Sequence, residues 1–239
     1  MSPTPEPTNA TAPPRELLIV GSGGFAREAV EAARALNARG PTWLLRGFLD
    51  DNPERHGETI GGLSVLGPLE LVHDRPDAAV VIATGRPDNY VSRRLIADRL
   101  DLDDTRYATI VHPAATVGET CQIGPGSVLL AHVDLTADVV VGSHVAIMPQ
   151  VVLPHDTRID DFATLASGVR VGGGCQVAEG AYIGSSACLL QETEVGPWAM
   201  VGMGSVVTRD VPGQRLWRGA PARDEGKAPL PGGQAPTPR

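Results

Sequence analysis

The sequence has few aromatic residues and no long hydrophobic run. Aromatic residues make up 4% of the 239 residues, whereas glycine and proline are abundant, with 28 and 21 copies. This composition suits a stack of repeats better than a globular core of helices. No apolar run approaches the roughly 20 residues of a membrane span, and the first residues, MSPTPEPTNATAPP, lack the basic start and apolar stretch of a secretion signal. We therefore expect a cytoplasmic protein that does not bind a membrane.

Positive charge is also scarce. The formal net charge is -8 at pH 7, the isoelectric point is near 5.2, and no run of basic residues occurs. Domains that bind nucleic acid usually carry a basic patch that neutralises phosphates. The charge pattern therefore argues against a nucleic-acid partner.

The most regular feature of the chain is an aliphatic residue at every sixth position from Val111 to Val207. A helix needs apolar residues three and four apart and a half-buried strand needs one at every second position, so a period of six predicts a parallel β-solenoid. The fourth residue after each aliphatic position is small or β-branched, and both can point inward to form a continuous core. The aliphatic positions are Val111, Val117, Ile123, Leu129, Leu135, Val141, Ile147, Leu153, Ile159, Leu165, Val171, Val177, Ile183, Leu189, Val195, Val201 and Val207.

The three cysteines do not have the spacing of a disulfide pair or a metal site. Cys121 and Cys175 occupy the same inward position, three 18-residue turns apart. With coils stacked about 4.8 Å apart they would lie about 14 Å from each other, beyond the roughly 7 Å limit for a disulfide. Cys188 has no partner or ligand spacing. We predict no metal and read Cys121 and Cys175 as small core residues.

Before residue 110, strand-like and helix-like segments alternate. LLIV (17–20), WLLRGFL (43–49) and AAVVIAT (78–84) are predicted strands, and 25–39 and 89–100 are predicted amphipathic helices. This order predicts a small parallel sheet with helices on its faces. We therefore predict a Rossmann-like α/β domain over 15–109 and an all-β solenoid over 110–224, with disordered tails at 1–14 and 225–239.

A glycine-rich turn follows the first predicted strand. Gly21, Gly23 and Ala26 fit the pattern G-x-G-x-x-[GA], and Asp50 and Asp51 end the next strand, where a ribose-binding acid would lie. Such a turn lets a phosphate approach backbone N–H groups at a helix N-terminus, although it can also be a tight connection without a ligand. Only about 95 residues precede the solenoid, too few for both halves of a dinucleotide fold, so a nucleotide or nucleotide sugar fits better.

These motifs together resemble a known family. The order LLIVGSGGFAREAVEAA, GFLDDNPERHGETIGGLSVLG, VVIATG, TIVHPAATVG, hexapeptide repeats and RGAPAR is similar to that of the sialic-acid O-acetyltransferases and UDP-4-amino-sugar N-acetyltransferases. The resemblance covers roughly residues 16 to 224. It implies a left-handed β-helix that assembles as a homotrimer, with acetyl-CoA between neighbouring prisms and a nucleotide-linked amino sugar as the acceptor. The implied activity is acetyl transfer to the amino group of that sugar.

The resemblance also implies a catalytic pair, His155 and Asp156. His155 is the third residue of the hexapeptide that starts at Leu153, so its side chain should point outward. An imidazole can accept a proton from an attacking amine or hydroxyl, and an adjacent carboxylate can fix its tautomer. Taken alone, an outward histidine is more typical of a solvated surface.

The family positions also supply candidate binding residues. Glycines at solenoid corners are needed for turns in any case, and a terminal arginine can be a phosphate ligand or a solvated charge. The candidates for acetyl-CoA are Thr164, Gly173, Gly184, Ser185, Met203 and Arg218. The candidates for the acceptor are Gly21, Ser22, Gly23, Gly24, Phe25, Asp50, Asp51, Thr84 and Gly85.

Three departures from the family pattern leave the acceptor open. Phe25 and Thr164 stand where relatives commonly have histidines, and Arg86-Pro87-Asp88 replaces a loop of small polar residues. One alternative is therefore an O- or N-acetyltransferase acting on a non-nucleotide sugar or a natural-product amine. Another is a non-catalytic hexapeptide scaffold whose N-terminal domain senses a nucleotide.

Overall fold

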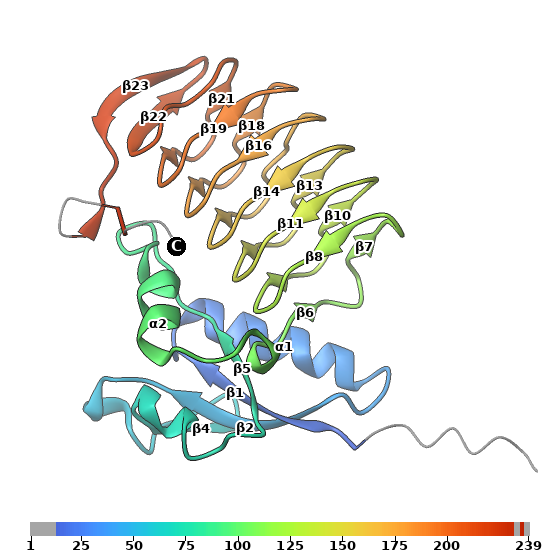
Figure 1. Cartoon of the computed structure of the whole chain (residues 1–239), viewed down its shortest axis with the longest axis vertical. Coiled ribbons are helices and arrows are strands. Elements are labelled where there is room, and N and C mark those ends of the chain that lie inside the picture. Colours follow the sequence, from blue (N-terminus) through green and yellow to red (C-terminus); the bar gives the residue numbers. More distant parts are fainter. Residues whose placement is uncertain (1–12, 232–234, 237–239) are drawn as a thin grey trace, which may run out of the picture.

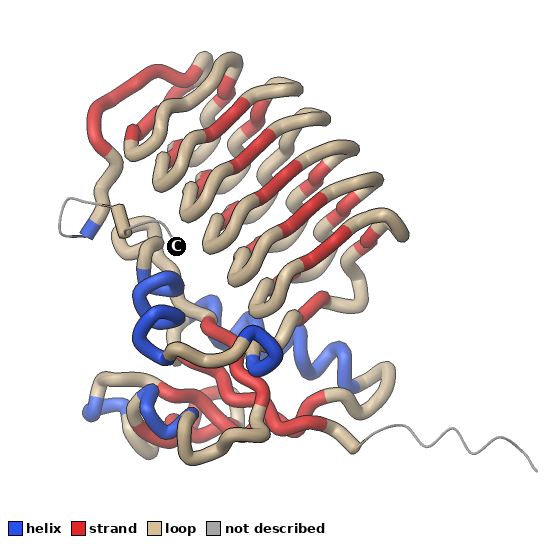
Figure 2. The backbone as a smooth tube through the Cα atoms, in the orientation of Figure 1, coloured by secondary structure: helices blue, strands red, loops and turns tan. Residues whose placement is uncertain are grey.

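The computed structural model describes residues 13–231 and 235–236. It consists of an N-terminal α/β domain and a long stack of coils that rises from it (Figure 1). The strands of successive coils lie in parallel rows along the stack (Figure 2). The predicted fold class, an α/β domain followed by a parallel β-helix, is confirmed.

The α/β domain is a five-stranded sheet with the order β3-β4-β2-β1-β5. Strands β1, β2, β4 and β5 are parallel, and β3 pairs with β4 as a hairpin that the sequence patterns did not predict. The bounds are β1 Arg15–Val20, α1 Gly24–Asn37, β2 Trp43–Leu49, η1 Pro53–Arg55, β3 Thr59–Ile60, β4 Leu63–Gly67, η2 Leu69–Val72, β5 Ala79–Ile82, α2 Ser92–Leu100 and η3 Asp104–Arg106. The apolar face of α1 packs with Ile110, Val128 and Ala146 of the solenoid, so this helix lies between the sheet and the coils.

The solenoid is a three-sided prism whose faces are parallel sheets, numbered here in the order in which the chain visits them. Face 1 contains β6 Ile110–Val111, β9 Val128–Leu129, β12 Ala146–Ile147, β15 Thr164–Leu165, β17 Tyr182–Ile183, β20 Met200–Val201 and β22 Arg215–Gly219. Face 2 contains β7 Thr116–Val117, β10 Asp134–Leu135, β13 Val152–Leu153, β18 Cys188–Leu189 and β21 Val206–Val207. Face 3 contains β8 Gln122–Ile123, β11 Val140–Val141, β14 Arg158–Ile159, β16 Gln176–Val177 and β19 Glu194–Val195.

The corners between the faces are turns that recur every coil. Corner 1–2 comprises residues 112–115, 130–133, 148–151, 166–169, 184–187 and 202–205. Corner 2–3 comprises 118–121, 136–139, 154–157, 172–175, 190–193 and 208–210. Corner 3–1 comprises 124–127, 142–145, 160–163, 178–181, 196–199 and 212–214. Since the α/β domain covers face 1, corner 2–3 lies on the opposite edge of the prism.

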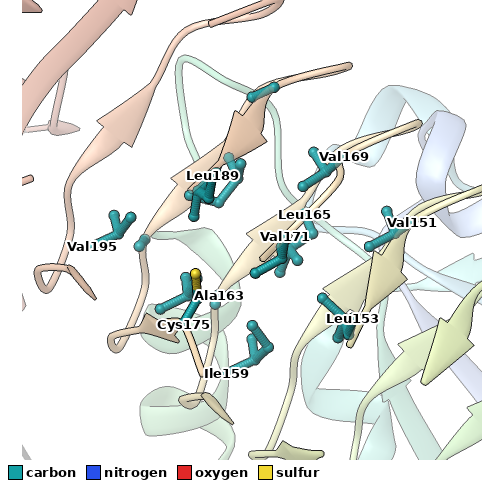
Figure 3. Packing of buried hydrophobic residues seen from close by; sticks show 14 of the residues in the cluster. Val151, Leu153, Ile159, Ala163, Leu165, Val169, Val171, Cys175, Leu189 and Val195 are labelled. Carbon is teal, nitrogen blue, oxygen red and sulfur yellow. The ribbon is translucent and has the colours of Figure 1, made fainter. Parts of the chain in front are cut away.

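The aliphatic residues that recur at every sixth position form the core of the prism. Figure 3 shows aliphatic side chains such as Leu153, Leu165 and Leu189 from successive coils in one apolar cluster. Almost all of the predicted inward positions are buried, and the exceptions belong to the first coil, namely Val111, Ala115, Val117, Cys121 and Ile123. There, β7 and β8 pair only with the next coil, and none of the described strands pairs with their other side.

Aromatic side chains at corner 3–1 attach the α/β domain to the prism. His144 stacks on Phe162 with ring centroids 5.0 Å apart, and the Tyr107 ring meets His144 edge-on at 4.4 Å. The Tyr90 hydroxyl donates to the Trp198 carbonyl oxygen at 3.0 Å. Such pairs add to the stability that apolar burial provides. Two apolar clusters therefore contain side chains of both domains, beside the core inside the prism.

The prediction of a disordered tail from residue 225 is wrong for its first residues. Strand β23, Ala222–Lys227, pairs antiparallel with β22, and Ala228 and Leu230 are buried. Their apolar side chains pack in the cluster that joins the domains, which a composition-based reading of this segment could not anticipate. Residues 1–12, 232–234 and 237–239 of the predicted tails lie outside the described residues. Within the described ranges, no helix has the length and apolar character that crossing a bilayer requires.

Candidate active site

His155 and Asp156 lie on the exposed edge of corner 2–3. The His155 Nδ1 atom is 2.8 Å from Asp156 Oδ2, and both side chains are about two-thirds exposed, at 68% and 69%. An ionised carboxylate can only accept hydrogen bonds, so it keeps the ring proton on Nδ1. The Nε2 lone pair is then left to accept a proton, which is the arrangement that a general base requires.

Gly173, in the next coil, leaves room for the imidazole because it has no side chain. A Cβ atom at Gly173 would lie 2.7 Å from both Cε1 and Nε2 of His155, closer than side chains approach one another. The Cε1 and Nε2 atoms of the ring therefore lie close to the glycine backbone. We predicted Gly173 as an acetyl-CoA contact, and the structure places it against the candidate base instead.

A cavity of about 370 Å³ lies at the carboxyl ends of β1, β2 and β5. The chain leaves β1 toward β2 on one side, and β5 pairs on the other side, so this is the switch point where open α/β sheets bind ligands. All predicted acceptor residues except Asp51 line the cavity, namely residues 21–25, Asp50, Thr84 and Gly85. Its volume is in the range of small-molecule sites.

The glycines of this cavity have different roles. A Cβ at Gly21 would lie 2.6 Å from Thr84 Cγ2, so Gly21 permits β1 and β5 to end side by side. A Cβ at Gly23 or Gly24 would meet no atom within 4 Å. These two glycines therefore keep space open at the start of α1, where no side chain caps the helix. Uncapped N–H groups of a first helical turn are suited to bind an anion.

Of the two aspartates, only Asp50 faces the cavity. Ser22 donates a hydrogen bond to the Asp50 carboxylate, and the Asn52 backbone N–H donates to it at 3.0 Å. Asp51 instead forms an ion pair with Arg99 and accepts from the Leu69 backbone N–H at 3.2 Å. The hydrogen bond from Arg99 lowers the pKa of the Asp51 carboxyl. The prediction that Asp51 contacts the acceptor is therefore corrected, since its carboxylate is held by Arg99 and Leu69 and does not line the cavity.

Three of the predicted acetyl-CoA residues share corner 1–2. Gly184, Ser185 and Met203 lie there on successive coils, and Met203 is 79% exposed. A Cβ at Gly184 would lie 2.5 Å from the Met203 backbone nitrogen, so the coils pack closely at this corner. The exposed apolar surface of Met203 suits the aliphatic arm of a coenzyme A, because apolar surface is favourably removed from water.

Arg218 lies near the end of face 1 and is 62% exposed. It forms an ion pair with Glu225, which raises the pKa of its guanidinium. A phosphate would therefore have to compete with Glu225 for this cation. Glu225 can reach Arg218 because it belongs to β23, the strand that pairs with β22.

Thr164 is not available to a ligand in the chain described here. Its side chain is 3% exposed, and its Oγ1 accepts a hydrogen bond from Arg93 at 2.7 Å. A contact of Thr164 with acetyl-CoA, predicted from the family position, would therefore have to be made by its backbone. Arg93, which reaches it from α2, was not singled out from the sequence.

The structure thus places the predicted residues in three separate groups. His155, Asp156 and Gly173 lie at corner 2–3, and the acceptor candidates lie in the α/β domain over face 1. Of the other acetyl-CoA candidates, Gly184, Ser185 and Met203 lie at corner 1–2, whereas Thr164 and Arg218 belong to face 1. The cavity also includes Arg86, from the loop that departs from the family pattern, and Arg55 and Ser92, which sequence motifs did not indicate. Among the described residues, no group of three or more His, Cys, Asp or Glu side chains is placed to hold a metal ion.

Residues 16–100 match the family model of the PglD N-terminal domain. The chain is similar to the acetyltransferase domain of PglB from Neisseria gonorrhoeae FA1090, at 29% identity and a TM-score of 0.78, over 88% of this chain and 99% of that one. The same domain has been solved in complex with acetyl coenzyme A.

Two perosamine N-acetyltransferases are also similar to the chain. A mutant of the Caulobacter crescentus enzyme in complex with CoA and GDP-perosamine is 25% identical with a TM-score of 0.78, over 89% of this chain and 97% of that one. The GDP-perosamine N-acetyltransferase of Escherichia coli O157:H7 is 27% identical over 178 residues, covering 72% of this chain and 77% of the relative. The chain therefore has a PglD-like N-terminal domain followed by a hexapeptide β-helix, and over both parts it is similar to sugar N-acetyltransferases.

Proposed function

We propose that this protein transfers the acetyl group of acetyl-CoA to the amino group of a nucleotide-linked amino sugar, with His155 as general base. The observation that carries this proposal is the pair of His155 and Asp156, which leaves the Nε2 lone pair exposed over Gly173. Likeness to proteins solved with acetyl coenzyme A and with GDP-perosamine supports the donor and the class of acceptor.

In this reaction the acceptor nitrogen attacks the thioester carbonyl carbon while His155 Nε2 takes a proton from that nitrogen. The C–N bond forms, and backbone N–H donors stabilise the oxyanion of the tetrahedral intermediate. The C–S bond then breaks, and the proton passes from His155 to the departing thiolate of CoA. Asp156 holds the imidazole tautomer and stabilises the imidazolium.

We further propose that each site is completed by a neighbouring subunit of a homotrimer. Face 2 joins the corner that carries His155 to the corner that carries Gly184, Ser185 and Met203. If face 2 is turned toward a three-fold axis, corner 2–3 of one subunit meets corner 1–2 of the next. Large exposed apolar residues on face 2 or at its corners support this orientation, namely Leu190, Met203 and Val206.

A site shared between subunits predicts complementation between two inactive variants. We expect His155→Asn and Asp50→Ala each to be almost inactive, because one lacks the base and the other an acceptor contact. Co-expressed with different tags and purified as mixed trimers, they should regain about a quarter of the wild-type rate, since random assembly gives that share of intact sites. A mixture no more active than its components would mean that His155 and Asp50 act from the same subunit.

The acceptor's nucleotide diphosphate is proposed to bind in the cavity at β1, β2 and β5. The uncapped start of α1 and the side chain of Arg55, which lines the cavity and is 31% exposed, can bind phosphate oxygens. The Asp50 carboxylate, held by Ser22 and Asn52, can accept hydrogen bonds from ribose or base.

Gly24→Ala tests this placement without destabilising the fold. The new methyl meets no protein atom within 4 Å and stands at the first residue of α1, where alanine is a good helix former. We expect the melting temperature to be unchanged or higher, while KM for the nucleotide sugar rises by about tenfold because the methyl occupies ligand space. Gly40→Ala, equally unhindered but distant from the cavity, is the matched control. Equal kinetics for the two variants would argue against nucleotide binding here.

The activity itself is tested by thiol release from acetyl-CoA with UDP-, dTDP- and GDP-linked amino sugars as acceptors. We expect one of these to give turnover far above the hydrolysis background. Acetyl-CoA binding without turnover of any amino sugar would contradict the proposal and favour a scaffold or a different acceptor.

A further inference from the structure

Arg93 is a fully buried cation at the junction of the two domains. Its relative exposure is 1%, although the residue belongs to α2 on the α/β domain. Burial lowers the pKa of its guanidinium to about 10. Arginine is rarely buried to this extent unless its donors are satisfied, since the desolvation cost is large.

All five recorded hydrogen bonds of Arg93 go to backbone carbonyls and one hydroxyl. On the prism side, Nε donates to the His144 carbonyl at 2.9 Å, and Nη2 donates to the Phe162 and Ala163 carbonyls at 2.7 and 3.2 Å. Nη2 also donates to Thr164 Oγ1 at 2.7 Å. None of the described carboxylates forms an ion pair with it. The planar guanidinium thus joins two coils of the prism in one plane.

On the α/β side, Nη1 of Arg93 donates to the Thr84 carbonyl at 2.8 Å. Thr84 and Gly85 form the edge of the acceptor cavity, and the Thr84 hydroxyl is 2.9 Å from the hydroxyl of Ser92, another cavity residue. A Cβ at Gly85 would lie 2.5 Å from Nη1, so this loop lies directly on the guanidinium. The positive φ of 134° at Gly85 favours glycine in addition.

We propose that Arg93 is a positioning residue for acetyl transfer, which fixes the 84–89 loop of the acceptor cavity at a set height over face 1 of the prism. This inference rests on the proposed function for its kinetic consequence. The same guanidinium uses the Thr164 hydroxyl as an acceptor, so Thr164 helps to position the acceptor cavity and its side chain does not contact acetyl-CoA. Without the hydrogen bonds of Arg93 the loop becomes mobile, and the acceptor amine is misplaced relative to the thioester.

Arg94 provides a matched control for this role. It is the next residue of α2, is 4% exposed and also crosses to the prism, where it pairs with Glu179. Its guanidinium lies 5.6 Å from the centroid of the Phe162 ring. Arg94 does not line the cavity and none of its recorded bonds reaches the 84–89 loop. Arg93→Met and Arg94→Met therefore both weaken the domain junction, but only the first affects the loop.

The first test is amide hydrogen exchange of the full-length protein without ligand. In Arg93→Met, peptides spanning residues 84–89 should exchange about tenfold faster than in wild type, whereas in Arg94→Met they should stay within about twofold. Thr164→Val, which removes one acceptor and keeps the volume, should accelerate the loop by about threefold and serves if Arg93→Met does not fold. Unchanged exchange in the loop, or the same acceleration in Arg94→Met, would overturn the proposal.

The second test is the split between the two substrates. Arg93→Met should raise KM for the nucleotide amino sugar by about tenfold and leave KM for acetyl-CoA within about twofold, while Arg94→Met changes neither by more than about twofold. A rise in KM for acetyl-CoA in Thr164→Val would show that Thr164 contributes to acetyl-CoA binding, and it would contradict the positioning role proposed for Arg93 and Thr164. A wild-type protein that acetylates no amino sugar would contradict the proposed function alone, because the exchange experiment needs no substrate.

Discussion

Replacing His155 with asparagine should lower kcat by about 10² to 10⁴-fold while KM for acetyl-CoA stays within about twofold. The side chain is 68% exposed and its hydrogen bond is to the neighbouring Asp156, so its loss removes the base without opening the core. The rate is measured by thiol release, and the fold is checked by thermal unfolding.

The control for this prediction is His73→Asn, which removes an exposed histidine of the α/β domain that lies outside the acceptor cavity. We expect its kcat to equal that of the wild type. If His155→Asn retained more than about a tenth of the wild-type kcat, the proton would have to be taken by another group.

Gly173→Ala should lower kcat/KM by about 10 to 100-fold without lowering the melting temperature. The added methyl would lie 2.7 Å from His155 Nε2, and the exposed imidazole can move away at little cost to stability. Its displacement removes the base from its place, and a shift of about 1 Å at a reacting group can cost about 10²-fold.

The matched comparison is the adjacent Gly172→Ala, which should lower the stability of the fold. Its methyl would lie 2.3 Å from the Gln191 backbone nitrogen of the next coil, which cannot move without disturbing the stack. We expect a loss of about 1 to 3 kcal/mol in the free energy of unfolding, as for an overpacked core. Full activity in Gly173→Ala would mean that the imidazole does not need to lie over this glycine.

The prism was predictable because its signal is periodic. Each coil repeats the same inward pair, so one register determines the faces and places His155 outward at a corner. Strands β1, β2 and β5 were predictable from apolar runs, whereas the β3–β4 hairpin is too short and too weakly patterned to recognise.

The details of the site depend on contacts that no local pattern records. Asp50 and Asp51 are identical in type and adjacent, and only their different partners, Ser22 for Asp50 and Arg99 for Asp51, separate their roles. Thr164 stands at a ligand position of the family, but its hydroxyl accepts a hydrogen bond from Arg93, a buried arginine 71 residues earlier. The sequence around Arg93 looks like an exposed helix face, since charged residues are usually solvated.

The central claim is that an amino group on a nucleotide sugar receives the acetyl group. The direct measurement compares two acceptors that share nucleotide and sugar and differ only in an amine or a hydroxyl at one carbon, with products identified by mass spectrometry and NMR. The account predicts a single N-acetylated product from the amine, none from the hydroxyl, and loss of that product in His155→Asn. Acetylation of the hydroxyl at a comparable rate, or product formation that does not depend on His155, would contradict it.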